Sequence, residues 1–315
     1  MSALTVPRGV AGAPHHLAAL ALFLAAVEGT TGALLSAHYI PTASGAHESV
    51  RTLVAEVPYG DLLRAVHARG ADLLVATAWL LVLASALLGR YRPPRAAAWC
   101  AVVLLGFVAL YEAFTGSVLP WSRDGAAGAQ VASATVGTIP VVGPWLRRAM
   151  LGGDAHGSVT LVRVWGAHAA MLPGVASVLL AVAASRREGA EAGAPAMPFA
   201  PHFTLRAAAL CTAATIALVL LAVFAPPGLG APAQDPPTGG AAPWYLGSVH
   251  AALRAMPGRV LGAPGGAVAV LLGTLAGVGL LALPWIDPRG ARLVRVLVVL
   301  LALAVFGGTV YARLG

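Results

Sequence analysis

Charge is scarce in this chain of 315 residues, and lysine is missing altogether. Only 10% of the residues are charged, all 20 basic residues are arginines, and aromatic residues make up 6%. Soluble domains carry about 25% charged residues, so this composition excludes an ordinary soluble globule and indicates a polytopic membrane protein. The arginines are scattered and form no basic stripe, which argues against nucleic acid as a partner despite the net charge of +8.

Cysteine is almost as scarce. Cys100 and Cys211 stand alone, each within an apolar segment. There is no CxxCH motif and no paired-cysteine spacing, so a c-type haem or an iron–sulfur centre has to lie on another polypeptide. We expect both cysteines to act as small apolar residues. We also expect no cleavable signal peptide, because the first apolar segment is too long and no small-residue cleavage site follows it.

Long apolar segments, by contrast, dominate the sequence. About 20 apolar residues cross the hydrocarbon core of a bilayer, and strand-like alternation is absent, which favours helices over a barrel. We therefore predict an all-α, polytopic membrane helical bundle of about seven transmembrane helices, at about 17–38, 66–89, 97–119, 161–184, 205–225, 264–286 and 292–312.

The predicted helices fall into two blocks. Residues 1–190 hold four helices and most of the histidines, and residues 191–315 hold three; a linker rich in Ala, Gly and Pro joins them. The short connections after the second, fourth and sixth helices are dense in arginine, which places them and the N-terminus in the cytoplasm. The composition, rich in Ala and Gly, is typical of a high-GC bacterium, so we expect a multi-pass protein of the bacterial inner (cytoplasmic) membrane.

Two of the nine histidines lie inside predicted spans with apolar residues on both sides. His67 enters the second helix from the outer side and His168 enters the fourth, so both are expected at the same depth. Two imidazoles at matched depth on neighbouring helices are what axial ligation of a haem iron requires. The alternative for either one alone is a helix-end histidine bound to a carbonyl. Their matched depth favours metal ligands, since ionisable residues within the membrane are usually functional.

Three further residues share the depth of these histidines. Gly32 and Gly116 allow the close backbone approach that a planar macrocycle between helices needs, although close helix packing alone explains many such glycines. Arg64 lies one turn outside His67, where it could pair with an anionic haem propionate or extend to the membrane interface.

Several motifs, in order, resemble the cytochrome b subunit of quinol–cytochrome c oxidoreductases (cytochrome bc or chloroplast type), over nearly the whole chain. They are TGALLSAHYIPTASGAHESV (31–50), GDLLRAVHARGA (60–71), FTGSVLPW (114–121), TIPVVGPWLRRAMLGGDAHGSVTLVRVWGAH (138–168), HFTLR (202–206), APWYLGSVHAALRAMPGRVLG (242–262) and LPWID (283–287). The resemblance implies that 1–190 is a four-helix haem-binding domain and 191–315 the three-helix C-terminal part. It also implies that His67 and His168 bind haem b, together with Arg64, Gly32 and Gly116.

The sequence departs from this family at the inner haem. The family carries a second histidine 14 residues further along the second helix and 14 or 15 further along the fourth. Those positions are Leu81, Val182 and Ala183 here. The positions of the inner glycines and the inner propionate-binding arginine are also apolar: Ala18, Val102 and Ala84. The resemblance therefore implies one haem b, on the outer side.

Both quinone sites of the family are also altered. The inner site uses a Lys-Asp pair where this chain has Arg206 and Ala207, so we expect that site to be lost. The PEWY motif of the outer site, whose glutamate accepts a proton from quinol, is APWY here, with Pro243 in place of the glutamate. His250, five residues after Tyr245, is a candidate replacement base because its ordinary pKa lies near neutrality. The alternative is an exposed helix-end histidine.

Two functions remain open. One is a membrane electron-transfer subunit that passes electrons between quinol, or a partner centre, and periplasmic carriers, without a complete bifurcated quinone cycle. The alternative is a non-catalytic structural paralogue in a larger respiratory complex. A transporter has little support, since no inverted repeat or broken span is evident. The family implies partners on separate chains, namely a c-type cytochrome and iron–sulfur or other redox subunits, in a dimer or larger complex. Whether the chain forms part of an enzyme stays open.

Overall fold

The computed structural model describes residues 5–7, 12–185, 196–233 and 242–314, and within these ranges it is almost entirely helical. Seven helical segments are long and apolar enough to cross a membrane: Ala13–Ser36, Gly60–Leu87, Ala96–Val118, Ser158–Ala183, Phe199–Phe224, Gly265–Ile286 and Arg292–Ala312. The predicted all-α bundle of seven spans is therefore confirmed. The first two spans begin four to six residues earlier than predicted, so His15 and His16 fall in the first turn of the first helix.

The spans correspond to six long helices and one composite helix. The long helices are α1 (Ala13–Ser36), α3 (Gly60–Leu87), α4 (Ala96–Val118), α9 (Thr204–Phe224), α11 (Gly265–Ile286) and α12 (Arg292–Leu314). The fourth span joins α7 (Ser158–Gly166), the π-helical turn η2 (Ala167–Met171) and α8 (Leu172–Ser185). A second π-helical turn, η3 (Phe199–Phe203), leads into α9.

Shorter elements connect the spans. They are α2 (Ala46–Glu56), α5 (Arg123–Gly137), α6 (Gly143–Leu151), the 3-10 turn η4 (Trp244–Leu246) and α10 (Gly247–Ala255). Two small antiparallel ladders complete the structure: β1 (Thr5–Pro7) with β2 (Ala196–Pro198), and β3 (Arg259–Val260) with β4 (Ala263–Pro264).

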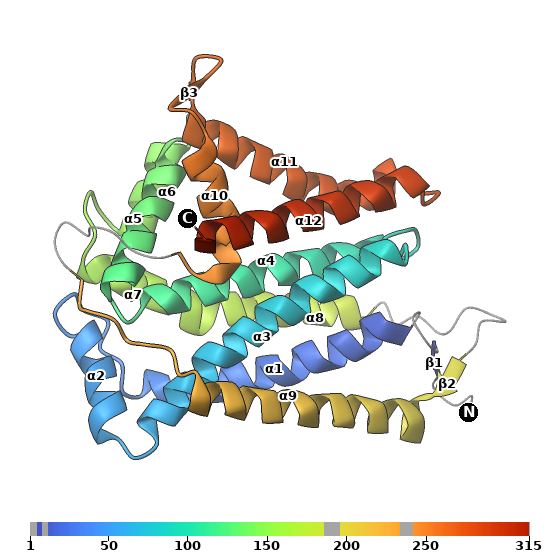
Figure 1. Ribbon diagram of the computed structural model, residues 1–315, viewed down its shortest axis with the longest axis horizontal. Helices are drawn as coiled ribbons and strands as arrows, with labels where there is room; N and C mark the ends of the chain where they lie inside the picture. The colour runs from blue at the N-terminus through green and yellow to red at the C-terminus, as the bar shows by residue number, and fades with distance from the viewer. Residues whose placement is uncertain (1–4, 8–11, 186–195, 234–241, 315) are drawn as a thin grey trace.

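The first four spans form a bundle, in which α1 packs on α3, α3 on α4, and α4 on α8 (Figure 1). Helix α9 lies against α1 and α3, whereas α11 and α12 lie on the far side of α4. The connecting helices α2, α5, α6 and α10 gather at one end of the spans, called the outer end below, and β1 and β2 lie at the opposite, inner end. The predicted boundary between residues 190 and 191 lies outside the described residues.

Two apolar clusters hold the ends of the bundle together. The outer cluster includes Val118, Trp121 and Leu161, all nearly inaccessible. The inner cluster includes Tyr91, Trp99 and Leu283, and the Trp99 Nε1 donates to the Leu280 carbonyl at 2.9 Å. The inner cluster thus ties the three-helix C-terminal part to α4, in the half of the bundle where the sequence lacks haem-ligand histidines.

Candidate functional site: two facing histidines in the outer half of the bundle

His67 and His168 face each other across the four-helix bundle. Their ring centres are 6.2 Å apart and their planes are nearly perpendicular, at 85°. Two imidazoles on opposite sides of one metal have ring centres about 6 Å apart, because each metal–nitrogen bond is about 2 Å long. The matched depth predicted from the sequence thus corresponds to two rings at the separation that a shared metal requires.

The backbone around His168 is unusual. This residue lies in η2, a π-helical turn between α7 and α8. Such a turn inserts an extra residue into an α-helix, shifts the direction of the following side chains, and is frequent at functional sites. The turn therefore sets the angle at which the fourth span presents His168 to His67.

A glycine lies against each imidazole. A methyl group on Gly32 would come within 3.1 Å of His67 Cε1, and one on Gly116 within 2.9 Å of His168 Cε1. Carbon atoms pack best at about 3.5 Å or more. Neither position therefore accepts a side chain while the ring stays in place.

The Nδ1 atom of His67 is bound on the side of α1. It lies 2.9 Å from Thr31 Oγ1 and 3.1 Å from Glu28 Oε2. The Thr31 hydroxyl also donates to the Val27 carbonyl, so it is free to accept from the ring N–H. Because Nδ1 is engaged in this way, Nε2 is the nitrogen left for a metal.

His168 has the same surroundings on α4. Its Nδ1 lies 3.0 Å from Thr115 Oγ1 and 2.8 Å from Glu112 Oε2. The Thr115 hydroxyl donates to the Tyr111 carbonyl at 2.9 Å, just as Thr31 donates to a carbonyl of its own helix. Each ring is thus held by one carboxylate, one hydroxyl and one glycine from a single neighbouring helix.

This arrangement corresponds to a repeated motif that the sequence analysis missed. EGTTG (28–32) in α1 and EAFTG (112–116) in α4 share the pattern E-x-x-T-G. Residues three and four apart lie on one face of a helix, so Glu, Thr and Gly all reach the same imidazole. The signal was available, because glutamate within an apolar span is rare and usually functional.

Arg64 lies one turn from His67, as predicted, and already has partners. Its Nη1 donates to the Pro227 carbonyl at 2.8 Å, and its Nη2 donates to Gly228 at 3.1 Å. Arginine has five N–H donors, so these two bonds leave donors for a further anion. The bonds also anchor the segment after α9 beside the histidines.

The APWY segment contacts both helices that border the site. Trp244 Nε1 donates to Asp72 Oδ1 of α3 at 2.7 Å, and the Tyr245 hydroxyl donates to the Ala113 carbonyl of α4 at 2.8 Å. Burial raises the pKa of Tyr245 to about 12, so its hydroxyl remains a donor near neutrality. Asp72, which Arg69 also binds at 3.0 Å, is a third acidic residue that the sequence analysis missed, after Glu28 and Glu112.

His250, the predicted replacement base, lies on α10, five residues beyond Tyr245. It is half-buried. Helix α10 itself packs mainly on α12, and Gly247 allows this because a side chain there would meet the Thr309 backbone. His250 thus lies on a helix that follows the APWY segment directly and packs on α12.

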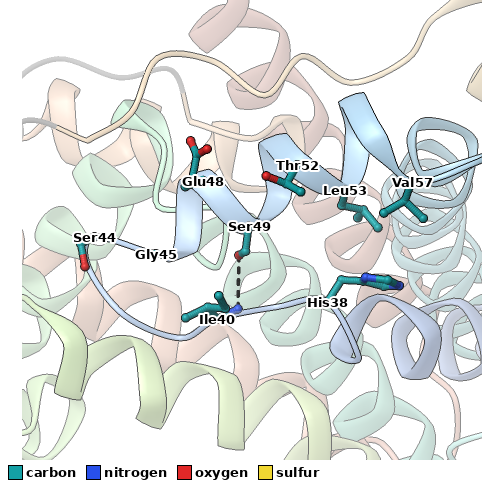
Figure 2. Close-up of a pocket in the computed structure, with 9 residues that line it drawn as sticks. All are labelled: His38, Ile40, Ser44, Gly45, Glu48, Ser49, Thr52, Leu53 and Val57. Atoms are coloured by element: carbon teal, nitrogen blue, oxygen red, sulfur yellow. Dashed lines mark hydrogen bonds between the residues drawn. The ribbon is translucent and has the colours of Figure 1, made fainter.

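A separate surface hollow of about 280 Å³ lies between the end of α1 and α2 (Figure 2). Its lining includes His38, Glu48 and Leu53, and a hydrogen bond from the Ile40 N–H to Ser49 Oγ at 3.2 Å joins two more of the lining residues. None of the residues predicted to bind haem or quinol lines it, so it is not the candidate site.

Comparison with known proteins gives a consistent result. The family model described as "Cytochrome b/b6/petB" matches residues 4–184, more than half of the chain. The chain belongs to the cytochrome b family. A cytochrome b of Rhodobacter capsulatus is 30% identical over 301 residues, covering 83% of this chain and 68% of that protein. A cytochrome b of Rickettsia conorii is 28% identical over 294 residues, covering 88% and 72%.

The fold agrees with this assignment. A chain of a structure described as "Hyperthermophilic respiratory Complex III" superposes with a TM-score of 0.82 at 23% identity, over 98% of this chain and 86% of that chain. Family membership confirms the predicted multi-pass membrane protein and its general role as an electron-transfer subunit of the cytochrome bc type, and it implies haem b. The paired histidines, their glycines and Arg64 fit that cofactor.

Proposed function

We propose that this cytochrome b carries a single haem b near the outer membrane surface, between His67 and His168. It would take electrons from quinol, or from a partner centre, and pass them to periplasmic carriers without a bifurcated quinone cycle. The proposal places the protein in a bacterial inner membrane with a cytoplasmic N-terminus. The observation that carries it is the opposition of the two imidazoles at 6.2 Å.

The residues around the site have separate tasks. When bound, haem b supplies a one-electron relay. His67 and His168 would hold it through Nε2, since Nδ1 of each ring is already engaged. Gly32 and Gly116 keep space beside the rings, and the remaining N–H donors of Arg64 would bind a propionate.

The residues in the inner half of the bundle favour a single haem per chain, because they lack the ligands for a second one. Leu81 and Val182 stand where family resemblance calls for histidines, and neither side chain can bind iron. An electron moving inward would have to cross roughly half of a ~30 Å hydrocarbon core without a relay. A bifurcated cycle, which sends one electron inward, therefore has no path within this chain.

The outer quinol pocket is proposed to keep its place beside the haem. Trp244 and Tyr245 are held on α3 and α4, the helices that carry His67 and Glu112. We assign the lost glutamate's role as proton acceptor to His250, a titratable residue five positions beyond that segment, on α10. Replacing it with Gln should slow reduction by a quinol analogue, while leaving the haem spectrum unchanged.

The second candidate function is a structural paralogue that holds haem only as part of its fold. Pro243, which cannot accept a proton, favours it. A quinol analogue added to the purified complex separates the two. Rapid haem reduction that an outer-site inhibitor blocks supports electron transfer, whereas a haem that only dithionite reduces supports the structural role.

We also propose that the electron leaves through other chains. Cys100 and Cys211 lie on different spans and have no histidine-bearing motif beside them, so they do not form a second redox centre. A c-type cytochrome and an iron–sulfur or other redox subunit, in a dimer or larger complex, would complete the path. Co-purification of such subunits with a tagged chain tests this.

A further inference from the structure

We propose that Glu28 and Glu112 are paired positioning residues, whose carboxyl groups lie against Nδ1 of the two imidazoles and hold the haem at a low reduction potential. The inference rests on the proposed haem site. Its basis is the pair of contacts from His67 Nδ1 to Glu28 Oε2, at 3.1 Å, and from His168 Nδ1 to Glu112 Oε2, at 2.8 Å.

Both carboxyl groups are held away from water. The side chain of Glu28 is 14% exposed and that of Glu112 is 21% exposed, within spans that are otherwise apolar. Burying a carboxyl group in such a place is costly unless it is paired. Glu28 Oε1 has no hydrogen-bond partner among the described residues, so the cost at this position is only partly offset by local contacts.

The fold also makes room for Glu28. A methyl group on Gly70, in α3, would overlap Glu28 Oε1. Gly70 lies three residues after His67, on the same side of α3. Close packing of α1 on α3 at this glycine therefore brings the Glu28 carboxyl group to the His67 ring. The chain thus has both the acidic residue in α1 and the space for it in α3.

The threonines cannot account for the glutamates. Thr31 and Thr115 each already provide a hydroxyl acceptor at 2.9–3.0 Å from Nδ1, which is sufficient to fix the tautomer and the ring orientation. A carboxylate adds what a hydroxyl does not, namely negative charge on the bond that supports the metal ligand. The role that remains for the two glutamates is therefore to change the electronic properties of the imidazoles.

The physical effect has a definite sign. A carboxylate in contact with the Nδ1–H of a metal-binding imidazole makes the ring more basic and a stronger donor to the metal. A stronger donor stabilises the oxidised, more positively charged iron, and two nearby negative groups act in the same direction. Because both histidines carry this feature, the two effects combine.

The test is a redox titration of the intact membrane complex carrying Glu28→Gln, Glu112→Gln or both. Glutamine keeps the size and a carbonyl acceptor but removes the charge. Each single change should favour the reduced haem by about tenfold, which for one electron corresponds to a rise of about 59 mV in midpoint potential. The double variant should rise further, and the low-spin ferric EPR signal should shift in each.

Two controls make the result specific. Glu56→Gln, on the exposed end of α2, removes one negative charge away from the imidazoles and should leave the potential unchanged. Glu28→Asp and Glu112→Asp keep the charge and should return the potential toward that of the unaltered protein. If one glutamine variant assembles without haem, the other one is measured, because each glutamate contacts Nδ1 of its own imidazole.

The outcomes separate this inference from the proposed function. An unaltered protein that lacks a bis-imidazole haem spectrum refutes the haem site itself. A normal spectrum together with unchanged potentials and EPR signals in the glutamine variants overturns only the role of the glutamates. A rise in Glu56→Gln equal to that in Glu112→Gln also overturns it, since the effect would then be one of overall charge.

Discussion

Substitution of Gly116 by alanine probes the haem site most sharply. The added methyl group would lie 2.9 Å from His168 Cε1, roughly 0.6 Å closer than the best carbon–carbon separation of about 3.5 Å. Without haem the ring can move aside. With haem bound, the ring would be held by the iron on one side and by Glu112 and Thr115 on the other, so the overlap would destabilise the bound state.

The cost of such overpacking is about 1–3 kcal/mol, which corresponds to haem binding about 5- to 150-fold weaker. The assay is haem occupancy of the purified complex, from the reduced-minus-oxidised spectrum per unit of protein. Gly166→Ala is the matched control, because it lies two residues before His168 and has nothing within 4 Å of its added methyl group. Equal occupancy and identical spectra in the two variants would refute the placement of haem between these helices.

Three further substitutions test other parts of the structure. Thr31→Ala should weaken haem retention, because it removes a hydroxyl 2.9 Å from His67 Nδ1. The adjacent Thr30→Ala should not, because the Thr30 hydroxyl binds only the Ala26 carbonyl. Equal haem retention in the two variants contradicts the role of Thr31. Trp244→Phe removes the 2.7 Å bond to Asp72 and should slow haem reduction by a quinol analogue without changing haem content, and an unchanged rate argues against a quinol pocket at this segment. Tyr91→Phe removes the 2.6 Å bond to Asp287 and should lower stability by about 1–3 kcal/mol. Burial alone raises the pKa of Asp287, but hydrogen bonds from the Ala291 N–H and the Tyr91 hydroxyl outweigh it and hold the pKa below its usual range. The stability that the Tyr91 hydrogen bond contributes is therefore complete above about pH 4. It is lost as the pH falls below that value and Asp287 becomes protonated. The difference in melting temperature between Tyr91→Phe and the unaltered protein should therefore shrink in acid, and a difference that grows in acid would contradict this sign.

Much of the fold could be predicted from the sequence, for a clear physical reason. A bilayer requires about 20 apolar residues in each helical span, and composition reveals such segments directly. The helix ends were predicted less accurately, since α1 begins at residue 13 and α3 at residue 60, both before the predicted apolar segments. The π-helical turn at His168 was not predicted, because an extra residue in a helix leaves no distinct mark on an apolar sequence.

The candidate site was predicted in part. Depth along a helix follows from residue number, so His67, His168 and the two glycines could be placed at one level. Which face of each helix meets its neighbour depends on packing, and this decides that Glu28 reaches His67 and Glu112 reaches His168. Likewise, the bond from Trp244 to Asp72 spans 172 positions and arises only when the C-terminal part packs on α3.

The ratio of haem to protein in the purified chain, from the pyridine haemochrome spectrum and a quantitative amino-acid analysis, tests the central claim most directly. One haem per chain is expected, since His67 and His168 form one facing pair and Leu81 and Val182 cannot form a second. Two haems per chain would contradict the account, because another pair of side chains would then have to bind iron in the inner half.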